Sequence, residues 1–163
     1  LSRAESGATH LECVPVSLRH SVERVSQLYT EVAANRGITL HLEEETSGMP
    51  DILADPIRLD EVLNNLVSNA IKHSPNKGNV WLRISRPDGE FLRVSVIDQG
   101  PGIPAESQSR IFERFYRAPG QDVDGVGLGL FISREIMRAH DGRIGLRERK
   151  HDLTEFYIDV PVA

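Results

Sequence analysis

Apolar residues recur every three or four positions in three stretches of the chain, and this spacing predicts three amphipathic helices. The first stretch is 16–34, where Ser17 can cap the helix start. Pro56 opens the second stretch in the first-turn position that proline favours, and Pro75 ends it. The third and most regular stretch is 128–140. These helices are long enough to cover one face of a sheet.

Alternating apolar and polar residues predict five strands, at 38–42, 80–85, 91–97, 143–147 and 155–160. The turn Pro87-Asp88-Gly89 joins the second strand to the third as an antiparallel hairpin. We also predict a short helix over 106–115 and a polar, turn-rich loop over 118–125. Helices layered on such strands indicate a two-layer α/β sandwich with a mixed, mostly antiparallel sheet.

Composition narrows the class of protein. A chain of 163 residues with 39% hydrophobic residues fits one domain and a short leader. The net charge of −5 argues against a nucleic-acid partner, whose binding surface would be basic. The single cysteine excludes an intramolecular disulfide. No apolar run approaches the roughly 20 residues that span a bilayer, so we expect no direct membrane contact by this domain.

The second predicted helix carries polar side chains on one face. Asn65, Asn69 and either Lys72 or His73 follow one another at spacings of three or four residues. Amides on an apolar helix are costly without partners. A neutral amide oxygen can ligate Mg²⁺ beside phosphates without adding negative charge. A hydrogen-bond network along the helix explains the pattern equally well.

A glycine-rich turn, DQGPGI at 98–103, follows the third predicted strand. A carboxylate at a strand end can accept a hydrogen bond from an exocyclic amine such as that of adenine. Glycines let the backbone approach a planar ring. Taken alone, the pattern is also typical of an ordinary turn.

Two further motifs bear on phosphate binding. In FERFYR, at 112–117, aromatic residues can clamp a mobile lid and an arginine can reach phosphate oxygens in a forked geometry, although an amphipathic turn would look the same. In GVGLGL, at 125–130, glycines open the third helix, where free N–H groups and the helix dipole favour a phosphate. No GK[ST] accompanies these glycines, so they are not a Walker motif.

Together and in this order, the asparagine helix, DQGPGI, FERFYR and GVGLGL resemble the N, G1, F and G2 boxes of histidine-kinase catalytic domains. Those domains belong to the Bergerat-fold ATPases, with gyrase, MutL and Hsp90. The resemblance covers residues 15–161, and the opening LSRAESG resembles the end of the second dimerisation helix of such kinases. It implies a boundary between a helix end with linker at 1–14 and a catalytic ATP-binding domain at 15–163.

The resemblance also implies a role for each matched residue of the asparagine helix. Asn69 would ligate Mg²⁺, Asn65 would contact phosphate or water, and Lys72 would meet the phosphates of ATP. His73 stands where the family often has tyrosine or phenylalanine against the adenine. We expect Asn65, Lys72 and Arg117 to take part in the transfer itself.

The remaining matched residues divide by the part of the nucleotide that they would meet. The adenine side would be formed by Asp98, which accepts from the amino group, and by Gly100, Gly102 and Ile103. Thr154 is a further candidate partner of Asp98, although no glycine precedes it. The phosphate side would comprise Tyr116 and Arg117 on a short helix, and Gly125, Val126, Gly127, Leu128, Gly129 and Leu130 around the lid at 118–125.

The implied activity is transfer of the ATP γ-phosphoryl group to a histidine on a separate dimerisation domain. None of the six histidines of this chain has the helical setting that the family uses for the phosphoacceptor, and His140 is expected to be a structural helix end. The implied partners are the dimerisation domain, absent here, and a response regulator. The full-length kinase would be a homodimer, with this domain in the cytoplasm whether or not its parent is anchored in the membrane.

Three alternatives remain open. An ATP-hydrolysing relative usually has a glutamate one helical turn before the Mg²⁺ asparagine, whereas this chain has Asn65, and an amide cannot accept a proton from water near neutral pH. An anti-sigma serine kinase shares the fold but usually lacks such a leader. A degenerate, partner-binding module is disfavoured by the intact Asn69, Asp98, Gly102 and GVGLGL.

Overall fold

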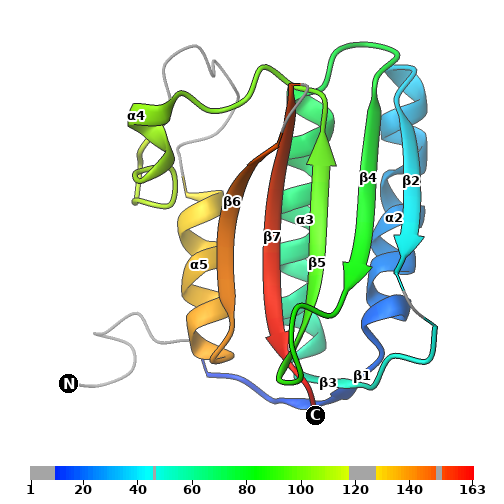
Figure 1. The fold of residues 1–163 in the computed structure, drawn as a ribbon, viewed down its shortest axis with the longest axis vertical. Coiled ribbons are helices and arrows are strands. Elements are labelled where there is room, and N and C mark those ends of the chain that lie inside the picture. Colours follow the sequence, from blue (N-terminus) through cyan, green and yellow to red (C-terminus); the bar gives the residue numbers. More distant parts are fainter. Residues whose placement is uncertain (1–9, 46, 118–127, 150–151) are drawn as a thin grey trace.

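A five-stranded sheet with helices on one face forms the body of the protein (Figure 1). The structure is a computed structural model and describes residues 10–45, 47–117, 128–149 and 152–163. The strands lie in the order β2 (Thr39–Glu44), β4 (Asn79–Ser85), β5 (Phe91–Asp98), β7 (Leu153–Pro161) and β6 (Arg143–Arg149). Among these described strands, β2 and β4 are the only neighbours that run parallel. The predicted mixed, mostly antiparallel sheet is confirmed.

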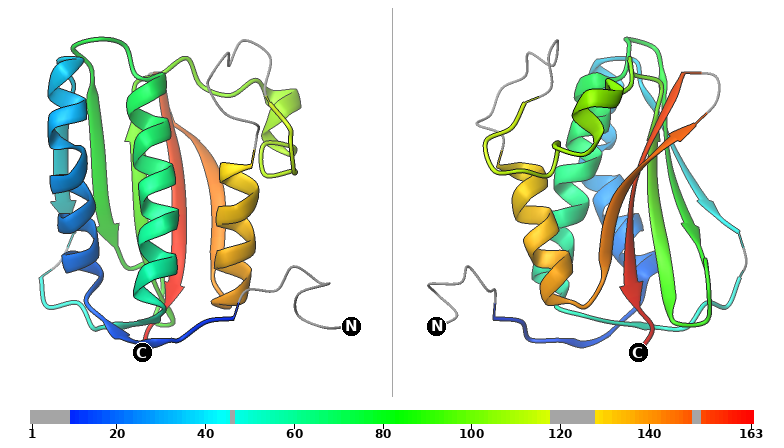
Figure 2. Two further views of the ribbon diagram at one scale, coloured as in Figure 1. Left: turned by 180° about the vertical axis from the view of Figure 1, so that it is seen from behind. Right: turned by 60° about the vertical axis from the view of Figure 1, so that its left-hand side comes forward.

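Three long helices cover the same face of this sheet: α2 (Leu18–Asn35), α3 (Pro56–His73) and α5 (Gly129–Ala139) (Figure 2). Both predicted helix starts are confirmed, because Ser17 caps α2 and Asp55 caps α3 ahead of Pro56. The central helix, α3, buries an unbroken apolar face against the sheet, formed by Leu59, Val62, Leu63, Leu66, Val67, Ala70 and Ile71. The polar residues Asn65 and Asn69 lie half-buried beside this apolar face.

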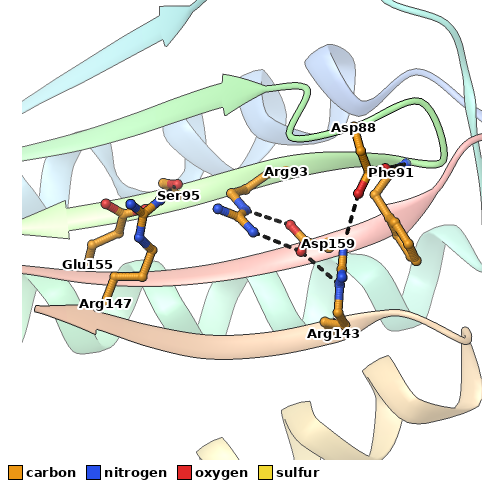
Figure 3. A network of polar contacts seen from close by, with 8 residues as sticks. All are labelled: Asp88, Phe91, Arg93, Ser95, Arg143, Arg147, Glu155 and Asp159. Carbon is orange, nitrogen blue, oxygen red and sulfur yellow. Dashed lines mark hydrogen bonds and ion pairs between the residues drawn. The ribbon is translucent and has the colours of Figure 1, made fainter.

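The other face of the sheet carries a network of charged side chains (Figure 3). The Asp159 carboxylate is buried, and it accepts hydrogen bonds from Arg93 Nε at 2.7 Å and Nη2 at 3.0 Å. Arg143 adds an ion pair to the same carboxylate at 3.0 Å. Ser95 donates to the equally buried Glu155 at 2.8 Å. These hydrogen bonds and ion pairs provide partners for the carboxylates buried on the face of the sheet that no described helix covers.

Two short strands that we did not predict form a second sheet at one end of the domain. β1 (Val14–Val16) pairs antiparallel with β3 (Ile52–Ala54), and Ile52 bridges to Val162 beside the end of β7. Each strand has three residues and β1 is centred on a proline, so neither shows the alternation over four or more residues that identifies a strand in sequence.

The helix predicted over 106–115 is wrong in its extent, because α4 comprises only Ala105–Gln108. After it the backbone continues in turns with hydrogen bonds between residues three apart, from Arg110 to Ser107, Glu113 to Arg110 and Tyr116 to Glu113. Phe115 has φ 64°, which no α-helix tolerates. The aromatic residues of FERFYR are spaced as on an amphipathic helix, but the backbone that carries them forms a series of turns.

Candidate functional site

The residues predicted to bind nucleotide lie on α3, at the end of β5 and at the start of α5. Asn65 on α3 donates from Nδ2 to Ser133 Oγ on α5 at 3.1 Å. A Cβ placed on Gly129, the first residue of α5, would lie 2.4 Å from Asn65 Oδ1. The asparagine helix and the glycine-rich start of α5 are therefore in direct contact. Ser133 lies one turn after Gly129, and no sequence motif identified it.

Asp98 ends β5 as a buried carboxylate, only 4% exposed. Its Oδ1 accepts a hydrogen bond from the Gly100 amide at 2.7 Å. Burial raises the pKa of Asp98 to about 6, against the lowering effect of that hydrogen bond. A carboxylate that is almost completely buried and ionised at neutral pH is a strong acceptor for a ligand that supplies a donor.

The loop after Asp98 packs onto the end of α3. A Cβ on Gly100 would lie 2.7 Å from both Asp98 Oδ1 and the His73 carbonyl oxygen. Only glycine therefore lets this loop approach the helix. The sheet end that carries Asp98 and the helix that carries the asparagines are thereby held together.

Thr154 and Gly102 complete the surroundings of Asp98. Thr154 on β7 is the register partner of Asp98, and it is buried. Gly102 has φ +80°, and a Cβ there would meet Thr154 Oγ1 at 3.7 Å. Ile103 packs partly buried against the core. The missing glycine before Thr154 made this position a poor match by motif, but strand pairing brings it to Asp98.

His73 is half-buried at the last position of α3. Burial lowers the pKa of His73 below its ordinary value; Lys72 and Arg36 lower it further, while a hydrogen bond to the Asn69 backbone opposes the change. Its Nε2 atom is buried and has no partner among the described residues. The ring is thus neutral at physiological pH and can present an apolar surface. Lys72, in contrast, is exposed to solvent.

Arg36, which sequence reasoning missed, holds the end of α3 in place. Its guanidinium donates to the carbonyl oxygens of Ile71 and, at 2.7 Å, Ser74. These are among the carbonyls at the helix end that lack partners within the helix. The Arg36 carbonyl also accepts from the Lys77 amide at 3.0 Å. A lone arginine after a helix carries no motif, so only the fold reveals it.

The phosphate-side arginine and tyrosine lie outside any helix, contrary to the prediction. Tyr116 shares a hydrogen bond of 2.7 Å with Ser107, and Arg110 lies over its ring at 4.5 Å. Arg117 is exposed. Phe112 meets Phe156 edge-on, with 6.2 Å between ring centroids, which anchors this segment to β7.

The glycine-rich segment is described only in part. Leu128 precedes α5 without a side-chain cap, and Gly129 and Leu130 form its first turn. Gly125, Val126 and Gly127, and the predicted lid at 118–125, lie outside the described residues. Across the described ranges no helix has the length and apolar character needed to cross a membrane.

His140, expected to be a structural helix end, is buried and bonded on both ring nitrogens. Nε2 accepts from the Asp55 amide at 3.0 Å, and Nδ1 donates to the Ile136 carbonyl at 2.9 Å. The expectation that His140 forms the end of a helix is confirmed.

Residues 54–163 match the family described as histidine kinase-, DNA gyrase B- and HSP90-like ATPase. Over 161 residues, 99% of this chain, the sequence is 33% identical to the alginate biosynthesis sensor protein KinB of Pseudomonas aeruginosa. The match spans 27% of that relative's length, so this chain corresponds to about a quarter of it.

Solved structures agree with the sequence matches. Full-length ShkA in complex with AMPPNP superposes with a TM-score of 0.83 and 33% identity, over 96% of this chain and 33% of that one. The catalytic domain of histidine kinase ThkA gives a TM-score of 0.83 and 29% identity, over 93% and 97%. ThkA in complex with the response regulator TrrA gives 0.80 and 28%, over 94% and 42%. The chain therefore belongs to the histidine kinase-, DNA gyrase B- and HSP90-like ATPase family, in which it corresponds to the catalytic domain of sensor histidine kinases.

Proposed function

We propose that this chain binds ATP and Mg²⁺ and transfers the γ-phosphoryl group to a histidine on a separate dimerisation domain of a two-component sensor kinase. The observation that carries the proposal is the buried Asp98 carboxylate, set in a glycine loop that packs directly on the helix of Asn65 and Asn69. A response regulator would then receive the phosphoryl group, as the ThkA–TrrA complex suggests by analogy. The domain would work in the cytoplasm, within a homodimeric parent.

The adenine would bind at Asp98. An ionised carboxylate there accepts from the exocyclic amine of adenine, whereas guanine would present an oxygen acceptor to it and be repelled. Gly102 has no side chain next to Thr154, so its backbone can approach a flat base closely. His73, neutral and half-buried, would give this pocket an apolar edge.

The triphosphate would lie toward Asn65, Asn69 and the start of α5. Mg²⁺, when bound, supplies charge neutralisation for the β- and γ-phosphates, and it takes oxygen ligands only. The Asn69 side chain fits such an ion because its amide oxygen is a neutral oxygen ligand, and it is half-buried on the same helix as Asn65. Lys72 and Arg117, both exposed, are free to swing onto phosphate oxygens.

Nucleotide titration of the chain tests this proposal, with AMPPNP as the probe. We expect AMPPNP to bind more tightly in the presence of Mg²⁺. Asn69→Ala should weaken binding about tenfold in Mg²⁺ and only slightly in EDTA, because the amide acts on the nucleotide through the ion. Calorimetry in both buffers measures the difference. Absence of binding at millimolar AMPPNP would contradict the proposal, and equal losses in both buffers would remove Asn69 from the metal site.

Asn65 disfavours ATP hydrolysis. Whether this residue decides if the γ-phosphoryl group goes to water or to a histidine can be tested. In Asn65→Glu the carboxylate would stand beside Ser133 and Gly129 and could act as a general base. We expect ATP hydrolysis to rise at least about tenfold, which is less than the roughly 10²–10⁴-fold that a well-placed general base supplies. Asn65→Gln is the matched control, since it has the same length without the base. A similar rate in both variants would show that the residue at 65 does not decide the reaction.

A further inference from the structure

Three segments of the chain meet at Asp55. Its Oδ1 caps the first turn of α3 by accepting from the Ile57 and Arg58 amides, at 3.1 and 3.3 Å. Its Oδ2 accepts from the Glu12 amide at 3.0 Å, 43 residues earlier in the chain. The hydrogen bond from Glu12 is the largest cause of the lowered pKa of Asp55, so the carboxylate is ionised at neutral pH.

His140, at the end of α5, holds Asp55 from the other side. Its Nε2 accepts from the Asp55 amide at 3.0 Å, while Nδ1 donates to the Ile136 carbonyl. An acceptor Nε2 requires the neutral ring with its proton on Nδ1. Asp55 and His140 are 8% and 6% exposed, so loss of the bond would leave a buried N–H without a partner. We call Glu12, Asp55 and His140 the latch.

The latch fastens residues 10–16, which we call the strap, across the base of the domain. Figures 1 and 2 show the strap passing beneath the ends of α3 and α5. Next to the latch, Val14 pairs with Ala54 and Val16 with Ile52. The strap comes immediately before α2, and it is the route by which any preceding part of a longer protein connects to this domain.

Both helices at the latch lead to the proposed nucleotide site. α3 starts at Asp55 and carries Asn69 and His73 at its far end, about 27 Å away for 18 residues. α5 runs the opposite way, from Gly129 against Asn65 to His140 at the latch, about 16 Å for 11 residues. The two helices pack on each other, so packed side chains connect the latch to the proposed nucleotide site without a break.

We propose that His140 is a positioning residue that docks the strap through Asp55, and that docking of the strap and nucleotide binding favour each other. The coupling rests on the proposed function of the site, whereas the docking does not. Coupling of two sites is reciprocal, so nucleotide must tighten the strap by the same factor as the docked strap tightens nucleotide.

The experiment follows hydrogen exchange of the Glu12 amide by NMR in the whole chain, with His140→Phe and the matched variant His140→Gln. Phenylalanine fills the ring volume without an acceptor, and the glutamine oxygen can replace Nε2. We expect exchange at Glu12 to quicken about tenfold or more in His140→Phe and to return close to the wild-type rate in His140→Gln, while core amides of β4 and β5 stay unchanged. In the wild type, AMPPNP with Mg²⁺ should slow exchange at Glu12.

A purely structural histidine would raise exchange at Glu12 and in the β4–β5 core alike, and that result would overturn the latch. Should His140→Phe not fold, the ring tautomer in the wild type decides: long-range ¹⁵N–¹H spectra should show a proton on Nδ1 and none on Nε2, and the opposite tautomer would refute the docking. If the chain binds AMPPNP but exchange at Glu12 does not change, the coupling is refuted. A chain that binds no AMPPNP would instead refute the proposed function, with the comparison of His140→Phe and His140→Gln still deciding the docking.

Discussion

Replacing Asp98 by asparagine should make the domain more stable at neutral pH and, at the same time, weaken nucleotide binding by about a hundredfold. The carboxylate is buried, and burial raises its pKa from 3.8 to about 6. The fold therefore disfavours the charged form that exists at pH 7.5. Asparagine keeps an oxygen that accepts from the Gly100 amide but removes the buried charge. Loss of a hydrogen bond from the ligand to a charged acceptor costs about 1.5–3 kcal/mol, enough for this loss of affinity.

The sign of the stability effect follows from the raised pKa. Well below pH 3.8 Asp98 is protonated in both the folded and unfolded states and contributes no penalty. Between pH 4 and 6 the unfolded state loses its proton first, so stability falls as pH rises, by about 2–3 kcal/mol in total. Urea unfolding of the wild type and Asp98→Asn should therefore agree near pH 3.5 and diverge by about this amount at pH 7.5. An asparagine variant that is less stable at pH 7.5 would contradict the assignment.

The same group sets a pH dependence for nucleotide binding. Only the ionised carboxylate is a full acceptor, so wild-type affinity should fall as the pH drops below about 6, and Asp98→Asn should lack this step. Titrations with AMPPNP between pH 5 and 8 measure both curves. A step that persists in the variant would assign the titration to another group.

The helices and the main strands were predictable because their patterns are long. α3 shows its cap, its first-turn proline and seven buried apolar positions at helical spacing, and each is local information. The site motifs were predictable for a related reason. Gly100 and Gly129 are glycines because another part of the chain comes too close for a side chain, and this requirement leaves a trace in the sequence.

Features that depend on long-range contacts were not predictable. Arg36 completes α3 from a turn 35 residues before Ile71, and nothing local marks it. Thr154 could be named from the sequence only as a poorly matching candidate, because it reaches Asp98 through the pairing of β5 with β7. The turns before Phe115 keep the spacing of an amphipathic helix while the backbone repeats every three residues, so the pattern alone favoured the wrong structure.

Gly100→Ala should destabilise the domain by about 3 kcal/mol, near the upper end for overpacking a close contact. The added methyl group would lie 2.7 Å from the His73 carbonyl oxygen and from Asp98 Oδ1, and neither can withdraw cheaply, because one is helix backbone and the other is a buried carboxylate. The loop would have to leave the end of α3, so nucleotide affinity should fall as well. Urea unfolding and AMPPNP titration measure the two effects.

Two other glycines serve as controls that distinguish this steric clash from backbone strain and from the general effect of replacing a glycine. Gly102→Ala meets nothing closer than 3.7 Å but has φ +80°, so it should cost only about 1 kcal/mol of backbone strain. Gly89→Ala has neither problem, since no atom lies within 4 Å of the added carbon, and should change stability by less than about 0.5 kcal/mol. The loss of stability should be largest for Gly100→Ala, smaller for Gly102→Ala and smallest for Gly89→Ala. A Gly100 variant as stable as the Gly89 variant would mean that the loop after Asp98 is not held against α3, and the proposed adenine pocket would lack a rigid wall.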